Sequence, residues 1–227
     1  MTTTTAPAIP SRDDELSSAV AAVIGSLQAQ HLQQVAAAAA RLARLRRALV
    51  SSPGSVPEAW ADTVGALPPH LQGATDAPND AERAMHASVC LYALHQQSQG
   101  APMHTTGREH GLGSAVRVLR QRRARPGSTH ADDDPVLRRF HALATATTFS
   151  ESLQHLRGLV ALLRGEAIPL DYGRLAADLR RLQDAGRSPQ VRLGWGRDLY
   201  RKTDKSLTPT ASTAVGPADD DDPGADA

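Results

Sequence analysis

Large apolar side chains recur every three or four residues along most of the chain between residues 12 and 204. The first such stretch contains Leu16, Val20, Ile24 and Leu27, and this spacing is typical of an α-helix with one buried face. No run of β-branched residues alternates with polar residues over the length of a strand. The pattern therefore predicts an all-α fold.

Prolines, glycines and capping residues divide this pattern into about nine helices. The segment from 81 to 99 is apolar around most of its circumference, which indicates a buried central helix. Ser150 and Asp171 are expected to cap two of the later helices, and Gly186 to end the second of these. We expect helices over 16–27, 31–50, around Trp60, 81–99, 112–123, from 135, from 150, 171–186 and from 188.

The two ends of the chain differ from this helical region. Residues 1–11 and 206–227 are rich in Thr, Ala, Pro, Ser, Gly and Asp and contain almost no large apolar side chains. Such segments cannot bury enough surface to offset the entropy lost on ordering. We therefore expect a disordered N-terminal tail, a single compact domain over 12–205 and a disordered acidic C-terminal tail.

The net charge of +1 conceals an asymmetry. Residues 206–227 hold five acids and no bases, so residues 1–205 hold 25 bases against 19 acids, or +6. Between residues 108 and 202 the count is 18 against 10, or +8. An excess of this size favours a polyanionic partner, although a merely soluble surface is the alternative. Because 23 of the bases are arginine in an alanine-rich chain, a GC-rich genome also accounts for part of the bias.

Enzyme and cofactor chemistry find little support. The histidines lack the spacing of a metal site, so no metal or cofactor is expected. The stretch GREHGLGSAV has Val116 where a dinucleotide-binding loop needs its third glycine. A hydrolase using His95 or His104 remains the enzyme alternative. The single cysteine and the lack of a long apolar run favour a cytoplasmic protein without a membrane span.

Arginine distributed over several helices is the remaining chemical feature. Spread in this way, guanidinium groups suit tracking of a phosphate backbone better than reading of bases by one helix. A helical adaptor that binds acidic protein surfaces is the alternative. The candidate nucleic-acid-binding residues are Arg44, Arg46, Arg47, Arg117, Arg120, Arg122, Arg123, Arg138, Arg139, Arg157, Arg164, Arg197, Arg201 and Lys202.

Six segments, in order, resemble the small subunit of type I-E CRISPR Cascade, the CasB family. They are ARLARLRRA at 40–48, LYALHQQ at 91–97, GLGSAVRVL at 111–119, HLRGLVALLR at 155–164, IPLDYGRLAADL at 168–179 and GWGRDLYR at 194–201. The resemblance covers about residues 12–204 and does not include the acidic tail.

The resemblance implies a non-catalytic helical subunit that sits as a head-to-tail pair in a crRNA-guided complex. Its implied partners are the crRNA, the target DNA with its displaced strand, the other Cascade subunits and a second copy of itself. The matched segments include Arg44, Arg46, Arg47, Arg117, Arg157, Arg197 and Arg201, and Arg120 directly follows the third segment.

The last segment contains Trp195, whose ring is either a stacking platform for bases or part of the core. At about 100° per residue, Val191, Trp195 and Leu199 share one stripe of a helix, and Arg197 and Arg201 lie nearly opposite. We therefore expect Trp195 to be buried and Tyr200, at the border of the arginine face, to be the aromatic ring nearer to a nucleotide. Reversing the charges of Arg197 and Arg201 is expected to leave folding intact.

The acidic tail leads to a first prediction. As a tethered polyanion, Asp219 to Asp222 are expected to compete with nucleic acid for the arginine side chains. Deleting residues 206–227 should tighten non-specific binding of single-stranded DNA at low salt, where screening is weak. Fluorescence anisotropy on both chains measures the difference, and equal affinities would leave the tail with a solubilising role only.

Overall fold

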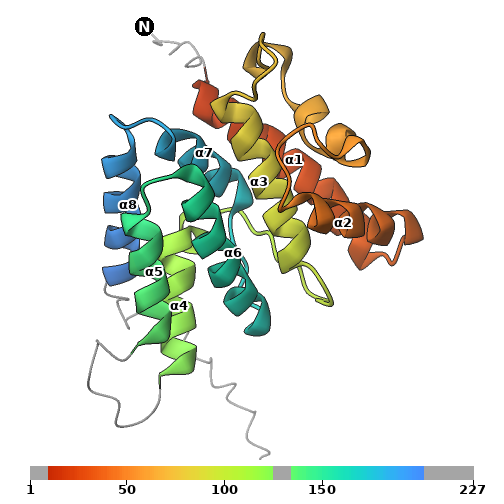
Figure 1. The fold of residues 1–227 in the computed structure, drawn as a ribbon. Helices are drawn as coiled ribbons and strands as arrows, with labels where there is room; N and C mark the ends of the chain where they lie inside the picture. The colour runs from red at the N-terminus through yellow and green to blue at the C-terminus, as the bar shows by residue number, and fades with distance from the viewer. Residues whose placement is uncertain (1–9, 125–133, 202–227) are drawn as a thin grey trace, which may run out of the picture.

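The structure, a computed structural model, describes residues 10–124 and 134–201 (Figure 1). The all-α prediction is confirmed, since the only β pairing within these residues is an isolated bridge between His104 and Leu170. The nine expected helices correspond to eight α-helices and to the 3-10 helix around Trp60. The α-helices are α1 (Arg12–Leu32), α2 (Ala36–Ala48), α3 (Asp80–His95), α4 (Leu112–Arg123), α5 (Pro135–Thr145), α6 (Phe149–Gly165), α7 (Tyr172–Leu182) and α8 (Ser188–Tyr200). The 3-10 helices are η1 (Pro57–Asp62), η2 (Val64–Ala66), η3 (Pro69–Leu71) and η4 (Arg108–His110).

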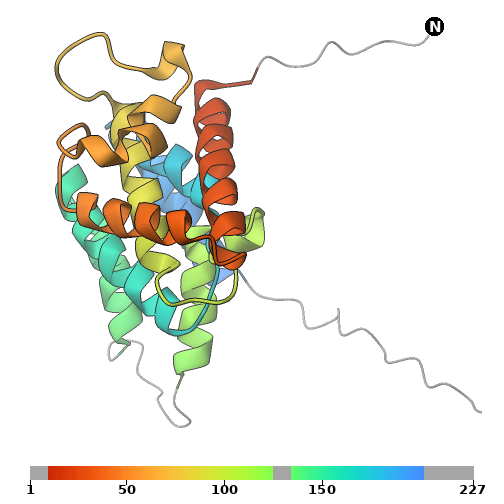
Figure 2. The same ribbon diagram turned by 90° about the vertical axis from the view of Figure 1, so that its right-hand side faces the viewer.

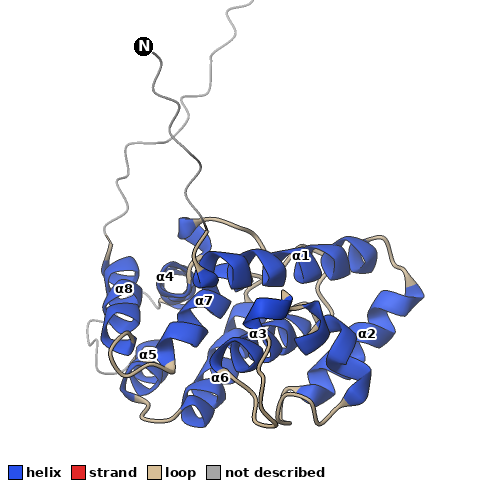
Figure 3. Cartoon of the chain, turned by 90° about the horizontal axis from the view of Figure 1, so that it is seen from above, coloured by secondary structure: helices blue, strands red, loops and turns tan. Residues whose placement is uncertain are grey.

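Helix α3 is the centre of a single compact domain (Figure 1). It packs against α1, α2, α6 and α7, and every side chain from Met85 to Ala93 is buried, as the apolar circumference of this segment predicts. Helices α1 and α2 cross each other on one side (Figure 2). Helices α4, α5 and α8 form the opposite end, so that α2 and α8 lie far apart (Figure 3).

The boundary between the first two helices differs from the sequence prediction. His31 was expected to begin the second helix, but it lies in the last turn of α1, which continues to Leu32. The break falls at Gln34, whose φ of 59° is in the left-handed region and therefore ends the helical path. Because glutamine is an unusual residue in that conformation, the predicted boundary was wrong.

Two later boundaries were also wrong by a few residues. Thr148, two positions before the expected Ser150, caps α6 by accepting the N–H of Glu151 at 3.1 Å. Helix α7 ends at Leu182, before the expected Gly186. The other expected cap is confirmed, since Asp171 accepts the N–H of Arg174 at 3.0 Å.

The predicted tails lie almost wholly outside the described residues. Ser11 is an exception, because it forms the N-cap of α1 with reciprocal hydrogen bonds to Asp14. Lys202, one of the candidate nucleic-acid-binding residues, lies outside the described part of the chain, as most of the two tails do.

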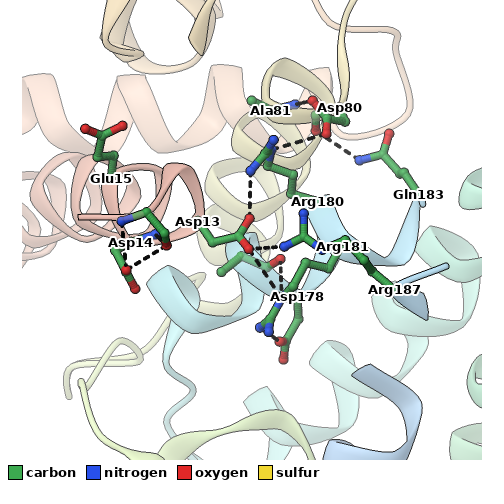
Figure 4. A network of polar contacts seen from close by, with 12 residues as sticks. Asp13, Asp14, Glu15, Asp80, Ala81, Asp178, Arg180, Arg181, Gln183 and Arg187 are labelled. Carbon is green, nitrogen blue, oxygen red and sulfur yellow. Dashed lines mark hydrogen bonds and ion pairs between the residues drawn. The ribbon is translucent and has the colours of Figure 1, made fainter. Parts of the chain in front are cut away.

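A network of guanidinium and carboxylate groups fastens the start of α1 to three other helices (Figure 4). The Asp13 carboxylate accepts a hydrogen bond from Arg180 of α7 at 2.8 Å and another from Arg187 at the start of α8. Arg180 also contacts Asp80 at the first position of α3, at 3.2 Å. The charge of Asp13 therefore joins segments more than 160 residues apart.

Three histidines are buried in the interior. His95 is fully buried, with its Nδ1 atom 2.9 Å from the Tyr172 hydroxyl, and burial lowers its pKa from 6.5 to about 4. Burial also lowers the pKa of His86 and of His104, despite the backbone hydrogen bonds of each ring. These rings are therefore neutral parts of the core at neutral pH.

The buried histidines lead to a prediction for acid stability. A histidine whose pKa is lower in the folded chain leaves stability unchanged above about pH 6.5, and reduces it as the unfolded chain takes up protons below that value. For His95 alone, the free energy of unfolding should fall by about 2 kcal/mol between pH 7 and pH 5. Urea unfolding at both pH values measures this fall.

The control is His95→Gln, which removes the titrating group. Its stability should be lower at pH 7, because the contact with Tyr172 changes, but should decline less steeply on acidification. A variant with the same pH dependence as the parent chain would assign the acid sensitivity to other groups.

Candidate nucleic-acid interface

Helices α2 and α6 bring three candidate arginines together. Leu42, Leu45 and Ala48 of α2 are buried, which turns Arg46 and Arg47 away from the core. Burial and the nearby positive charges of Arg164 and Arg47 lower the pKa of Arg46. We call Arg46, Arg47 and Arg164 the α2–α6 arginine group. Within the described residues, no carboxylate pairs with any of the three.

The segment after α3 holds Arg164 in place with neutral groups. The Oε1 atom of Gln97 accepts a hydrogen bond from Nη1 of Arg164 at 2.9 Å. Gln99 donates to the backbone carbonyl of Arg164 at 3.0 Å. Both contacts orient the end of α6 without neutralising its charge, so the α2–α6 arginine group keeps an excess of positive charge.

Arg44 lies on the other flank of α2 from Arg46, as their spacing on the helix requires. It is half-buried, and its Nε atom is buried without a hydrogen-bond partner in the described residues. On the same flank, the Arg41 guanidinium is occupied by the Asp62 carboxylate. Arg44 therefore does not belong to the α2–α6 arginine group.

A second group surrounds a buried carboxylate on α8. Asp198 is 3% exposed, and its oxygens lie 3.6 Å from Arg108, 3.3 Å from Arg174 and 3.0 Å from Arg201. Arg117 of α4 donates to the backbone carbonyl of Arg201 at 2.9 Å. We call Arg108, Arg117, Arg174 and Arg201 the Asp198 arginine group. Three guanidiniums share one carboxylate, and Arg117 joins them through the Arg201 backbone, so positive charges outnumber the negative charge of Asp198 in this group.

Two glycines make this arrangement possible. Helix α8 lies so close to α4 that a Cβ atom on Gly113 would be 2.1 Å from the Trp195 carbonyl. Gly107 has a φ of 130°, which only glycine adopts readily, and donates its N–H to Asp171 at 3.0 Å. The glycines of the GREHGLGSAV stretch therefore serve helix packing and the placement of Arg108.

Three other candidates are engaged at the end of α4. Arg120 pairs with Asp134 at 2.6 Å and Arg123 pairs with Glu166 at 2.8 Å. Arg122 donates to the backbone carbonyl of Glu166. These contacts join α4 to the start of α5 and to the end of α6, so part of the charge expected to be available here is offset.

The remaining candidates are exposed side chains. Arg138 and Arg139 lie on α5, Arg157 lies on α6 and Arg197 lies on α8. No ion pair involves them within the part of the chain that the structure describes. The structure thus distributes the predicted arginines over two groups, one paired set and several single positions.

The sequence analysis missed Arg108, Arg174 and Asp198. Asp198 did carry a signal, because it follows Val191 and Trp195 on the apolar stripe of α8. An acid at a core position requires cations around it. Arg108 and Arg174 come from distant segments, and the sequence shows nothing that brings them to α8.

Other kinds of site find no support in the described residues. They contain no group of three His, Cys, Asp or Glu side chains that could hold a metal ion, and no helix long and apolar enough to cross a membrane. His95 and His104, the residues of the hydrolase alternative, are buried and packed against Tyr172.

Comparison with known proteins gives consistent matches. The family model of the CRISPR-associated protein Cse2 matches residues 41–200. The chain is similar to the crystal structure of CasB from Thermobifida fusca, with 32% identity, a TM-score of 0.65 and coverage of 82% of this chain and 98% of that one. None of the curated proteins matches the chain.

Two further solved structures share the fold. A CRISPR-associated protein of the Cse2 family from Thermus thermophilus is 26% identical, with a TM-score of 0.57 and coverage of 84% and 99% of the two chains. A chain of a CRISPR RNA-guided surveillance complex is 20% identical, with a TM-score of 0.58 and coverage of 81% and 92%. At that identity the last match shows the fold alone.

Trp195 is buried, as its helical position predicts, and gives a test of what it contributes. It is 3% exposed, and its Nε1 atom donates to Asp178 at 2.7 Å. Replacing Trp195 by Ala should lower the free energy of unfolding by about 3–5 kcal/mol, and Trp195→Phe should lose less because it keeps most of the packing. Urea unfolding measures both, and a stable Trp195→Ala variant that has lost DNA binding would instead favour a stacking role.

Arg197 and Arg201 should respond differently to charge reversal. Arg197 is exposed, so Arg197→Glu should leave the melting temperature nearly unchanged and weaken DNA binding. Arg201 pairs with buried Asp198, so Arg201→Glu places two carboxylates together and should destabilise the chain. This corrects the expectation that both reversals spare folding, and equal melting temperatures of the two variants would contradict it.

Proposed function

The chain belongs to the Cse2 family of CRISPR-associated proteins, and we propose that it is a non-catalytic, nucleic-acid-binding subunit of a type I-E Cascade surveillance complex. In this role it stabilises the crRNA and target DNA, including the displaced strand of the R-loop. Its partners are the other Cascade subunits and a second copy of itself, and it acts in the cytoplasm.

The α2–α6 arginine group is the observation that carries the proposal. Burial and the like charges of Arg164 and Arg47 lower the pKa of Arg46, and the residue that holds Arg164 is a neutral glutamine. Bringing such charges together is unfavourable unless an anion is bound between them. A phosphate backbone supplies that anion at regular intervals.

The Asp198 arginine group provides a second contact region at the other end of the molecule. Figure 3 shows α2 and α8 at opposite ends, so a nucleic acid that contacts both groups must extend across the domain. Exposed Tyr200 lies beside Arg201 at the end of α8, where an aromatic ring can stack on an unpaired base. Guanidinium groups that contact phosphates, and a ring that stacks on a base, accept every sequence.

Sequence-independent binding suits a subunit of a guided complex. Guide pairing with the target strand provides the specificity, and the displaced strand requires a partner that accepts any sequence. Holding that strand on arginine side chains lowers the free energy of the open R-loop relative to the reannealed duplex. No proton transfer or covalent step is needed for this role.

A paired substitution in the α2–α6 arginine group tests the proposal. Arg46→Gln together with Arg164→Gln should weaken binding of single-stranded DNA by about tenfold or more, because charge-assisted bonds to phosphate are lost. The slope of log affinity against log salt should become shallower by about 1.4. Anisotropy titrations with mixed-sequence oligonucleotides at several salt concentrations measure both quantities.

The matched control is Arg12→Gln, which removes one exposed charge at the start of α1. It should change affinity and salt slope much less than the paired substitution. An unchanged affinity in the paired variant, or strong preference of the parent chain for one oligonucleotide sequence, would contradict the proposed function.

A further inference from the structure

A polar pocket of about 230 Å³ lies between the α5–α6 connection and the helices α3, α7 and α8. Arg83 of α3 and Arg192 of α8 line it, and neither belongs to the candidate nucleic-acid interface. The remaining lining residues are Ala146, Thr147, Thr148, Phe149, Ser152, Leu182 and Gln183. Thr147, Thr148 and Ser152 carry hydroxyl groups, and Ala146, Phe149 and Leu182 form the apolar wall.

Neutral groups hold both guanidiniums in place. Arg83 donates to the side-chain oxygen of Gln183 at 2.5 Å and to the Pro78 carbonyl at 2.6 Å. Arg192 donates to the Ala146 carbonyl at 2.7 Å. Within the described residues neither arginine pairs with a carboxylate, so two positive charges line one small pocket without a counter-ion.

Arg192 also has hydrogen-bonding capacity that the chain does not use. Its Nε atom is buried and has no partner among the described residues. A buried donor of a charged group is costly to leave unpaired. Because this atom has almost no accessible surface, an anion in the pocket can accept its hydrogen only after a small turn of the Arg192 side chain.

The start of α6 adds to the positive potential. Thr148 is the N-cap of this 17-residue helix, and Thr148 and Phe149 both line the pocket, so the positive end of the helix dipole lies beside it. One acid is nearby, since Glu151 accepts the N–H of Thr147 at 2.8 Å. Glu151 does not line the pocket, and its other oxygen is 3.8 Å from His155. Its single negative charge leaves an excess from the two arginines.

We propose that this pocket binds a phosphoryl group. Donors converge on it from three elements, α3, α8 and the start of α6, and a tetrahedral oxyanion presents acceptors in several directions at once. A carboxylate is planar and is satisfied by one guanidinium. The phosphoryl group is either that of a small phosphate ester or a backbone phosphate of a nucleic acid. The proposal is independent of the proposed function, because the pocket uses different residues.

The first experiment uses inorganic phosphate as the probe. Isothermal titration of phosphate into the full chain in low-salt chloride buffer should give binding at one site. Arg192→Gln and Arg83→Gln should each weaken it by about tenfold or more. The control is Arg12→Gln, which removes the same charge from an exposed position outside the pocket and should leave phosphate binding unchanged.

The outcomes are distinct. Absence of phosphate binding by the parent chain, or binding that both pocket variants retain, would overturn the proposal. If the variants fail to fold, the arginine Nε–H resonances of the parent chain decide the matter, since phosphate should shift the Arg192 signal and leave that of Arg12 in place. A shift of neither or of both signals counts against the pocket.

A second experiment distinguishes the two sources of the phosphoryl group. If the ligand is a backbone phosphate, an oligothymidylate should displace inorganic phosphate, and Arg192→Gln should weaken oligonucleotide binding. If it is a small phosphate ester, the oligonucleotide should bind without displacing phosphate. Failure of the proposed function would appear as unchanged DNA affinity in the Arg46 and Arg164 variant, whereas failure of the pocket would appear as phosphate binding that Arg83→Gln and Arg192→Gln both retain.

Discussion

The buried carboxylate of Asp198 constrains the whole C-terminal half of the molecule. A carboxylate with 3% exposure is strongly unfavourable unless cations and hydrogen-bond donors surround it. Its three guanidinium neighbours come from η4, α7 and the end of α8, so all three elements must meet in one place. That meeting also requires α8 to lie against α4 at the distance that Gly113 permits. The gathering of arginines at this end is therefore a consequence of how a single negative charge is buried.

Arginine performs different tasks in this fold, according to which carboxylates lie close to its side chain. Arg180 and Arg187 share Asp13 and fasten helices together, whereas Arg46 has the like charges of Arg164 and Arg47 nearby and pairs with no acid in the described residues. Arginine suits both tasks because its planar group donates in several directions and stays charged. Only arginines of the second kind provide excess positive charge for a polyanion. The net charge of a segment consequently overstates how many side chains are available to phosphate.

The sequence predicts those features that depend on local periodicity. The helical class, the buried α3 and the burial of Trp195 follow from apolar spacing, because a helix places residues 3.6 positions apart on one face. Prediction from the sequence fails where a contact between distant segments determines the structure. The pairing of Arg123 with Glu166 spans 43 residues, and the boundary at Gln34 has no glycine or proline to mark it. The two arginine groups belong to this second kind, so their members were predicted as a list of positions without their grouping.

The arginines of both groups project from fixed elements of the fold, and this bears on the affinity for a polyanion. Arg46, Arg164 and the arginines around Asp198 project from helices or from a 3-10 turn fastened by Gly107 and Asp171. Side chains fixed in this way lose less conformational entropy on binding than the same charges on a flexible segment. Fixed spacing also limits which phosphates can be contacted together, whatever bases they join. Under the proposed function, this support follows the course of a nucleic-acid backbone and leaves the choice of sequence to pairing between strands.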